Sequence, residues 1–137
     1  MTIRKIGFCL AAGLFCASQA QAVEIWHSNT VWANMGMCSA TFSFDSGTEP
    51  VGQFNMAIEL VDPQGTVVSK DVIAVEPFGD SEATRYQIAY GEGEHYCDDN
   101  LTVKITAISD ANGNALPLQM LTPRDFTPMK IVTGANQ

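Results

Sequence analysis

Apolar and polar residues alternate in short runs along most of the chain after residue 22, which is typical of strands with one buried face. In residues 54–60, Phe, Met, Ile and Leu occupy every second position, and the Asp-Pro-Gln-Gly sequence at 62–65 then predicts a β-turn. Comparable patterns predict strands over residues 23–26, 38–44, 54–60, 67–75, 84–90, 101–107, 118–121 and 126–132. Pro117, Pro123 and Pro128 have no N–H to donate to a sheet ladder, so we expect the strands over 118–121 and 126–132 to be edge strands or broken ones.

These elements predict an all-β domain built from two packed sheets. No segment of helical length shows the 3.6-residue period, and turn residues recur about every 8 to 12 residues. About seven short strands indicate an immunoglobulin-like or fibronectin type III-like sandwich, with a small closed barrel as the competing architecture. The sequence shows no repeat, low-complexity tract or linker, so we expect one domain over residues 23–137.

Residues 1–22 differ from the rest and predict a signal peptide. Arg4 and Lys5 precede an apolar run at 6–15, and the Ala-Gln-Ala sequence at 20–22 supplies the small residues that a signal peptidase requires. Lipidation at Cys16 is the alternative, but bulky Leu and Phe precede that cysteine. The apolar run is too short to span a bilayer, so we expect export without membrane insertion, to the periplasm or beyond it.

The charge of the expected mature chain narrows its partners. Two of the seven Lys and Arg residues leave with the signal peptide, so five remain against fifteen Asp and Glu, a net charge of −10. Nucleic acids and anionic lipid surfaces bind basic proteins, so neither is an expected partner. The acidity either keeps an exported domain soluble or complements a basic patch on a protein partner, and the sequence leaves both open.

Export also determines the role of the cysteines. Cys9 and Cys16 belong to the expected signal peptide, which leaves Cys38 and Cys97 in an oxidising compartment. We predict one structural disulfide between these two residues, tying the two sheets together, because no C-x-x-C pair indicates a redox site. In an immunoglobulin-type topology they would belong to the second and sixth strands, which face each other across the core.

Residues capable of metal or acid-base chemistry gather in the run 91–99, which holds four carboxylates and a histidine. Such a run can bind Ca²⁺, but its spacing does not match an EF-hand, and the role of the acidic loop 92–99 stays open. His27, Met35 and Met37 offer an imidazole and two thioethers of the kind that bind Cu(I), although Met is also a common core residue. The sequence lacks a nucleophile elbow, a zinc-protease motif and a phosphate-binding loop, so we expect no catalytic residue, cofactor or bound metal.

Trp26 and Trp32 are the candidate binding residues. Asn29, Asn34 and Gly36 lie nearby in the sequence, and tryptophan in polar, glycine-containing surroundings is typical of recognition hot spots. The alternative is that both tryptophans belong to the core, and the sequence does not decide between the two.

Three segments carry a resemblance to a known family. The opening VEIWHSNTVW at 23–32, the strand CSATF at 38–42 and the late Cys97, all following an export signal, resemble the interleukin receptor mimic proteins of pathogenic Escherichia coli. The resemblance implies a small secreted virulence protein with a fibronectin type III-like sandwich. It also implies a homodimer formed by strand exchange, and binding to host cytokine receptors or cytokines. Residues 117–128 and 76–82 are candidate hinges for the exchange, which would cover exposed sheet edges.

The leading hypothesis is therefore a secreted binding protein that engages host immune receptors. A fimbrial-type structural subunit is the first alternative, although residues 131–137 lack the alternating ending of a donor strand. A periplasmic metal-binding protein that uses His27 and the methionines is the second, and the metal content of the purified protein separates it from the others.

Overall fold

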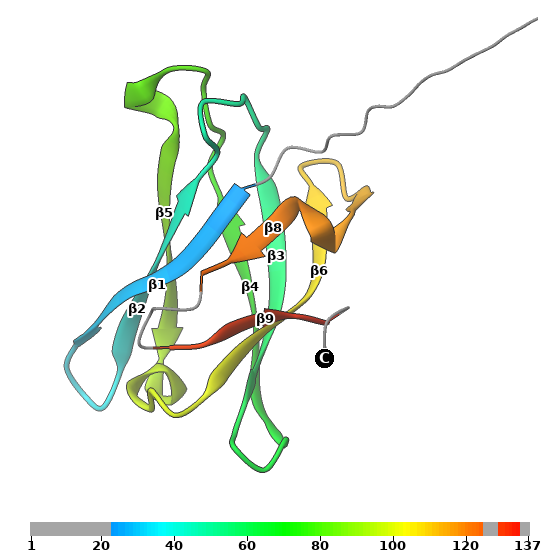
Figure 1. Ribbon diagram of the computed structural model, residues 1–137. Coiled ribbons are helices and arrows are strands. Elements are labelled where there is room, and N and C mark those ends of the chain that lie inside the picture. The colour runs from blue at the N-terminus through cyan, green and yellow to red at the C-terminus, as the bar shows by residue number, and fades with distance from the viewer. Residues whose placement is uncertain (1–22, 125–128, 135–137) are drawn as a thin grey trace, which may run out of the picture.

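The computed structural model describes residues 23–124 and 129–134, which form two sheets packed face to face (Figure 1). The predicted signal peptide and the first part of the predicted strand 126–132 lie outside the described residues. No helix among the described residues is long and apolar enough to cross a membrane.

The strand order identifies the type of sandwich. The strands are β1 (Val23–Trp32), β2 (Cys38–Asp45), β3 (Phe54–Val61), β4 (Val67–Val75), β5 (Tyr86–Gly93), β6 (Thr102–Asp110), β7 (Ala115–Leu116), β8 (Leu121–Pro123) and β9 (Ile131–Thr133). One sheet has the order β5-β2-β1-β8, and the other has the order β4-β3-β6-β7 with β9 also paired to β6. The fourth strand lies beside the third and not beside the fifth, which distinguishes this fold from a constant-type immunoglobulin domain. The predicted sandwich is confirmed in its fibronectin type III-like form.

The alternation in β3 shows why the sequence folds in this way. Phe54, Met56, Ile58 and Leu60 are almost completely buried, and the residues between them are half-buried on the outer face. The predicted turn at 62–65 follows, where the Gly65 N–H donates to the Asp62 carbonyl at 2.9 Å. Alternate residues of the neighbouring strands complete one core between the sheets, with Val23, Ile25, Phe42, Phe44, Val75, Val103 and Ile105 among its buried members.

The predicted strand over residues 118–121 is wrong. Leu118–Met120 forms the 3₁₀ turn η5, and β8 begins only at Leu121. Pro117 has no N–H, so the ladder to β6 stops at Leu116, and the Met120 N–H instead donates to the Pro117 carbonyl at 3.1 Å.

The predicted disulfide between Cys38 and Cys97 is present, with the two Cα atoms 5.2 Å apart. Cys97, however, lies in the 3₁₀ turn η4 (Glu94–Cys97), which leads from β5 in one sheet to β6 in the other. The bridge therefore does not join facing strands of opposite sheets, as the immunoglobulin comparison predicted. It fastens the connection between the sheets to the first residue of β2.

Candidate functional site

The outer face of the β5-β2-β1-β8 sheet carries large apolar side chains that the core does not use. Tyr86, Ile88 and Tyr90 on β5 are 53%, 53% and 57% exposed. The alternation in this strand was visible in the sequence, but its apolar side faces outward, opposite to that of β3. Isolated exposed apolar residues are ordinary, whereas a row of three on one strand indicates an interaction surface.

The packing beneath β5 explains this orientation. Its core-facing positions include Ala89 and Gly91, and a Cβ atom at Gly91 would overlap the ring of Tyr96. The rings of Phe42 and Tyr96 fill this part of the core in an edge-to-face pair, with centroids 6.4 Å apart. A large side chain would not fit at Gly91, and Ala89 beside it is also small, so the aromatic residues of β5 lie on the outside.

The neighbouring strands extend the row into a surface. Thr41 and Ser43 of β2 lie opposite Tyr90 and Ile88, and Trp26 of β1 lies opposite Ser43. Since neighbouring strands are about 4.8 Å apart, Trp26 and Ile88 lie about 10 Å from each other across one serine. We call this surface the aromatic face, and its residues are Trp26, Ser39, Thr41, Ser43, Tyr86, Ile88 and Tyr90.

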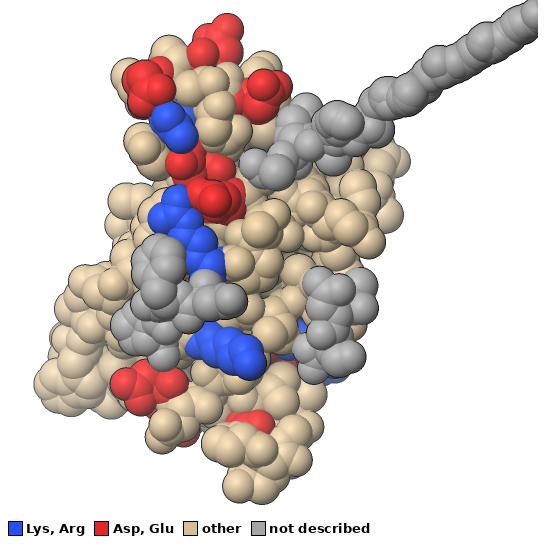
Figure 2. All heavy atoms as spheres, in the orientation of Figure 1, with Lys and Arg blue, Asp and Glu red and all other residues tan. Residues whose placement is uncertain are grey.

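The chemistry of the aromatic face is that of a protein-recognition surface. Tyr and Trp offer rigid, amphipathic contact area, and Ser and Thr between them offer adaptable hydrogen bonds. Figure 2 shows mostly uncharged side chains over β5 and the β1–β2 hairpin, with acidic side chains gathered near the end where β2–β3 and β4–β5 connect. Such a surface can bury apolar area against a partner without desolvating many charges.

Two arginines border the aromatic face. The Arg124 guanidinium lies 3.9 Å from the centre of the Trp26 ring and donates through Nε to Glu24 at 3.2 Å. The Arg85 guanidinium lies 5.1 Å from the centre of the Tyr86 ring. These cation–π contacts hold two of the aromatic side chains in place before any partner binds.

Arg85 also makes a partly buried ion pair with Asp45. Its Nε donates to Oδ1 of Asp45 at 2.8 Å, and its Nη2 donates to Oδ2 at 3.0 Å. Its Nη1 donates to both carboxylate oxygens of Glu82. The hydrogen bonds from Arg85 hold the pKa of Asp45 below its ordinary range, and they raise the pKa of Arg85. Arg85 therefore has its charge satisfied within the domain.

The structure separates the two predicted binding residues, Trp26 and Trp32. Trp26 and Trp32 are six residues apart, and in a regular strand this even separation would place both side chains on the same face. The register, however, steps from His27 opposite Phe42 to Asn29 opposite Thr41, so Ser28 forms a β-bulge. Trp26 consequently lies on the aromatic face, and Trp32, which is 69% exposed, points from the other side of the sheet.

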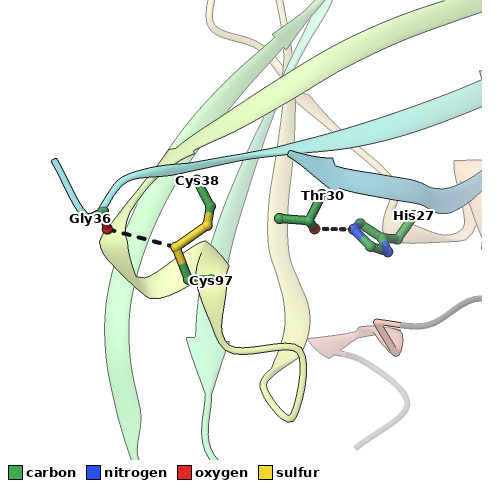
Figure 3. Close-up of a disulfide and its surroundings, with 5 residues drawn as sticks. All are labelled: His27, Thr30, Gly36, Cys38 and Cys97. Carbon is green, nitrogen blue, oxygen red and sulfur yellow. Dashed lines mark hydrogen bonds between the residues drawn. A yellow bond between two sulfur atoms is a disulfide. The ribbon is translucent and has the colours of Figure 1, made fainter. Parts of the chain in front are cut away.

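Trp32 lines a pocket of about 470 Å³ beside the disulfide, together with His27, Thr30, Tyr96 and Asp99. Figure 3 shows Nε2 of His27 in contact with Oγ1 of Thr30, and the distance between these atoms is 2.7 Å. Burial lowers the pKa of His27, so the ring is neutral at pH 7. Its Nδ1 is buried and has no hydrogen-bond partner among the described residues.

Figure 3 also shows Sγ of Cys97 near the carbonyl oxygen of Gly36, and the distance between these atoms is 3.7 Å. Because Cys97 has no thiol proton in the disulfide, this is a packing contact that places the β1–β2 hairpin turn against η4.

The suggested metal ligands are not brought together. Met35 lies in the hairpin turn and is 90% exposed. His27 is buried and lies five residues before the end of β1, which places it about 16 Å along the strand from that turn. In the acidic run, Glu92 belongs to β5, Tyr96 turns into the core and Cys97 forms the disulfide. Within residues 23–124 and 129–134, no group of three or more His, Cys, Asp or Glu side chains is placed to hold a metal ion.

Sequence reasoning missed Tyr86, Ile88 and Tyr90 as candidate functional residues. The available signal was that Ala89 and Gly91, on the other side of the strand from these residues, fill little of a core. A strand with bulky residues on one side and very small ones on the other is a candidate for an outward-facing apolar row.

The described residues thus form a small β-sandwich with the Cys38–Cys97 disulfide and an exposed aromatic face. The family model for IrmA, interleukin receptor mimic protein A, matches residues 23–123, so the chain belongs to the interleukin receptor mimic protein A family. It is similar to the solved structure of IrmA from Escherichia coli, with 31% sequence identity and a TM-score of 0.67, covering 79% of this chain and 95% of that one. A search of curated proteins finds no match.

Proposed function

We propose that this protein is an exported, non-catalytic binding protein that engages a host cytokine receptor or cytokine through the aromatic face. The observation that carries the proposal is the exposure of Tyr86, Ile88 and Tyr90 on a strand whose inward side holds the small residues Ala89 and Gly91, the latter with no room for a Cβ atom. The family description, interleukin receptor mimic protein, supplies the class of partner. Trp26 belongs to the proposed surface, and Trp32 to the separate pocket beside the disulfide.

Export and assembly are part of the proposal. Residues 1–22 act as a signal peptide that delivers residues 23–137 to the periplasm or the exterior, where the disulfide forms. The protein forms a homodimer by strand exchange, with residues 117–128 or 76–82 as the hinge. In support, β8 and β9 are short terminal strands that pair with different sheets, so a second copy can supply either without changing its pairing.

A binding screen tests the proposed function. The full chain is expressed with its own leader, purified from the exported fraction, and applied to an array of human extracellular proteins that includes cytokines and cytokine receptor ectodomains. We expect saturable binding to members of the cytokine or cytokine receptor class. A blank array, or binding confined to unrelated proteins, would contradict the proposal. Light scattering coupled to size exclusion gives the mass of the same sample, and a monomer at micromolar concentration would contradict the dimer.

The fimbrial alternative gains no support from the structure. A subunit that awaits a donor strand exposes its core where that strand is missing, but β7 and β9 of this chain both pair with β6, and the core residues in the described part of the chain are buried. The proposal therefore keeps the receptor-binding function as its only candidate.

A further inference from the structure

The edges of the two sheets differ in how well they are protected. An exposed edge strand presents unpaired N–H and C=O groups, and proteins shield such edges with short strands, Pro, Lys or inward-pointing charges. β7 spans two residues, while β8 and β9 span three each, and β8 ends at Pro123. The β4 edge carries Lys70, whose side chain is 74% exposed, and Asp71, which points inward to accept a hydrogen bond from Tyr96.

β5 lacks these devices. It is eight residues long, with the sequence YQIAYGEG, and contains neither Pro nor Lys. It pairs with β2 along one side, and no backbone hydrogen bond joins its other side to the described part of the chain. This edge is therefore long, regular and open.

The register shows which backbone groups lie on the open side. Just beyond the ladder, the Ser46 N–H donates to the Arg85 carbonyl at 2.9 Å. Hydrogen-bonded and non-hydrogen-bonded pairs alternate along an antiparallel ladder, so the next pair, Asp45 with Tyr86, is of the non-hydrogen-bonded kind. By the same alternation, Ile88 and Tyr90 also direct their N–H and C=O groups away from β2.

The residues with free backbone groups are thus the ones whose side chains form the row on the aromatic face. A strand added along β5 would bond to the backbone of Tyr86, Ile88 and Tyr90. Every second side chain of that strand would then lie against their exposed rings and methyl groups. Strand addition of this kind takes its affinity from main-chain bonds and its specificity from alternate side chains.

We propose that the open edge of β5 binds an extended segment of a partner protein by strand addition. The segment has apolar or aromatic residues at alternate positions and basic residues at the end that lies beside Glu92 and Glu94. The inference rests on the proposed binding function and specifies how the partner docks.

Charge selects the occupant. Glu92 and Glu94 lie at one end of the edge, and the Glu94 side chain is 75% exposed. At the other end, the charge of Arg85 is already satisfied by Asp45 and Glu82. If the β5 strands of two copies paired antiparallel, the acidic end of each would lie beside the Arg85 end of the other, where no cation is available. A basic partner segment therefore fits better than another copy of this chain.

Peptide selection tests the proposal. The probes are phage-displayed decapeptides with Val, Ile, Thr or Tyr fixed at alternate positions and the other positions random, selected on the purified full-chain product. We expect enrichment of peptides with Lys or Arg near one terminus. Failure to enrich any peptide would overturn the proposal.

Amide hydrogen exchange then identifies the docking mode. In the free protein, the amides of Ala89 and Gly91 should exchange slowly and those of Ile88 and Tyr90 rapidly. Saturation with a selected peptide should slow Ile88 and Tyr90 at least tenfold. Unchanged exchange at these amides would overturn the inference, as would protection that grows with protein concentration in the absence of peptide, because that result assigns the edge to a second copy.

Variants on both sides complete the test. Ile88→Pro removes an outward N–H and keeps the ladder to β2, and it should weaken peptide binding at least tenfold, whereas Ile88→Ala keeps the N–H and should weaken binding less. Peptides N-methylated at alternate residues in one phase should lose binding, and those methylated in the other phase should retain it. An equal loss of binding for the two sets of peptides would overturn strand addition, and this comparison requires no change to the protein.

The two proposals fail separately. A blank receptor array with alternating peptide protection would remove the receptor function and leave the docking edge. Receptor binding without slowed exchange at Ile88 and Tyr90 would do the reverse.

Discussion

The hydroxyl of Tyr96 donates a hydrogen bond of 2.9 Å to Oδ2 of Asp71 and thereby joins the turn η4 to strand β4. Tyr96 is 3% exposed, and burial raises the pKa of its hydroxyl. The bond links the turn that follows β5 to a carboxylate on the opposite sheet.

Loss of this hydroxyl should destabilise the domain. We expect Tyr96→Phe to lower the free energy of unfolding by about 1–3 kcal/mol, because the half-buried carboxylate of Asp71 loses a donor. The measurement is urea denaturation at pH 7. The matched control is Tyr90→Phe on the exposed face, for which we expect a change within about 0.5 kcal/mol. Equal effects of the two variants would show that the Asp71 bond does not stabilise the fold.

The disulfide should contribute much of the stability. Its cysteines are separated by 59 positions, and the chain-entropy model gives about 4 kcal/mol for a loop of that length. We therefore expect the Cys38→Ala/Cys97→Ala variant to lose about 4 kcal/mol in urea denaturation, and reduction of the wild type with dithiothreitol to cause a similar loss. A loss below about 1 kcal/mol would contradict the structural role.

His27 should make the domain less stable in mild acid. Burial lowers the pKa of its ring in the folded state, so the unfolded chain takes up the proton first as the pH falls below about 6.5. This contribution lowers stability with falling pH by up to about 1.4 kcal/mol per pH unit. His27→Phe should flatten the stability profile between pH 7.5 and 5. A wild-type slope in His27→Phe would refute the assignment.

The Asp45–Arg85 pair should act at lower pH. Because Arg85 holds the pKa of Asp45 below its ordinary range, its stabilisation is complete above the unfolded pKa near 4 and disappears as the pH falls through the folded pKa. Asp45→Asn should cost about 1–3 kcal/mol at pH 7. The difference between variant and wild type should shrink towards pH 2, as followed by thermal unfolding. A difference that is constant with pH would indicate packing and not charge.

The sequence predicted the parts of the fold that local patterns determine. The alternation of Phe54, Met56, Ile58 and Leu60 identified β3 and its buried face, and the cysteine count identified the disulfide. The small residues Ala89 and Gly91 were the available signal for the direction of β5, but its cause, the meeting of Phe42 and Tyr96 in the core beneath Gly91, is visible only in the structure.

The bulge at Ser28 also depends on tertiary contacts and not on a local sequence pattern. Nothing in the run of residues 23–32 marks an extra position, and only the pairing with β2 reveals it. Both tryptophans were identified as binding candidates, but the bulge places them on different sides of the sheet. The fold could thus be predicted mainly from the sequence, whereas locating the candidate site required the tertiary structure.

The most direct test of the account measures receptor binding by variants of the aromatic face. With the receptor or cytokine identified by the array, surface plasmon resonance compares the wild type with Tyr86→Ser/Tyr90→Ser. The control is Val72→Ser, which removes an exposed apolar residue from β4 in the other sheet. We expect the double variant to weaken binding at least about 30-fold, as loss of hot-spot residues does, and the control to stay within about twofold. Wild-type affinity in the double variant would contradict the assignment of function to this face.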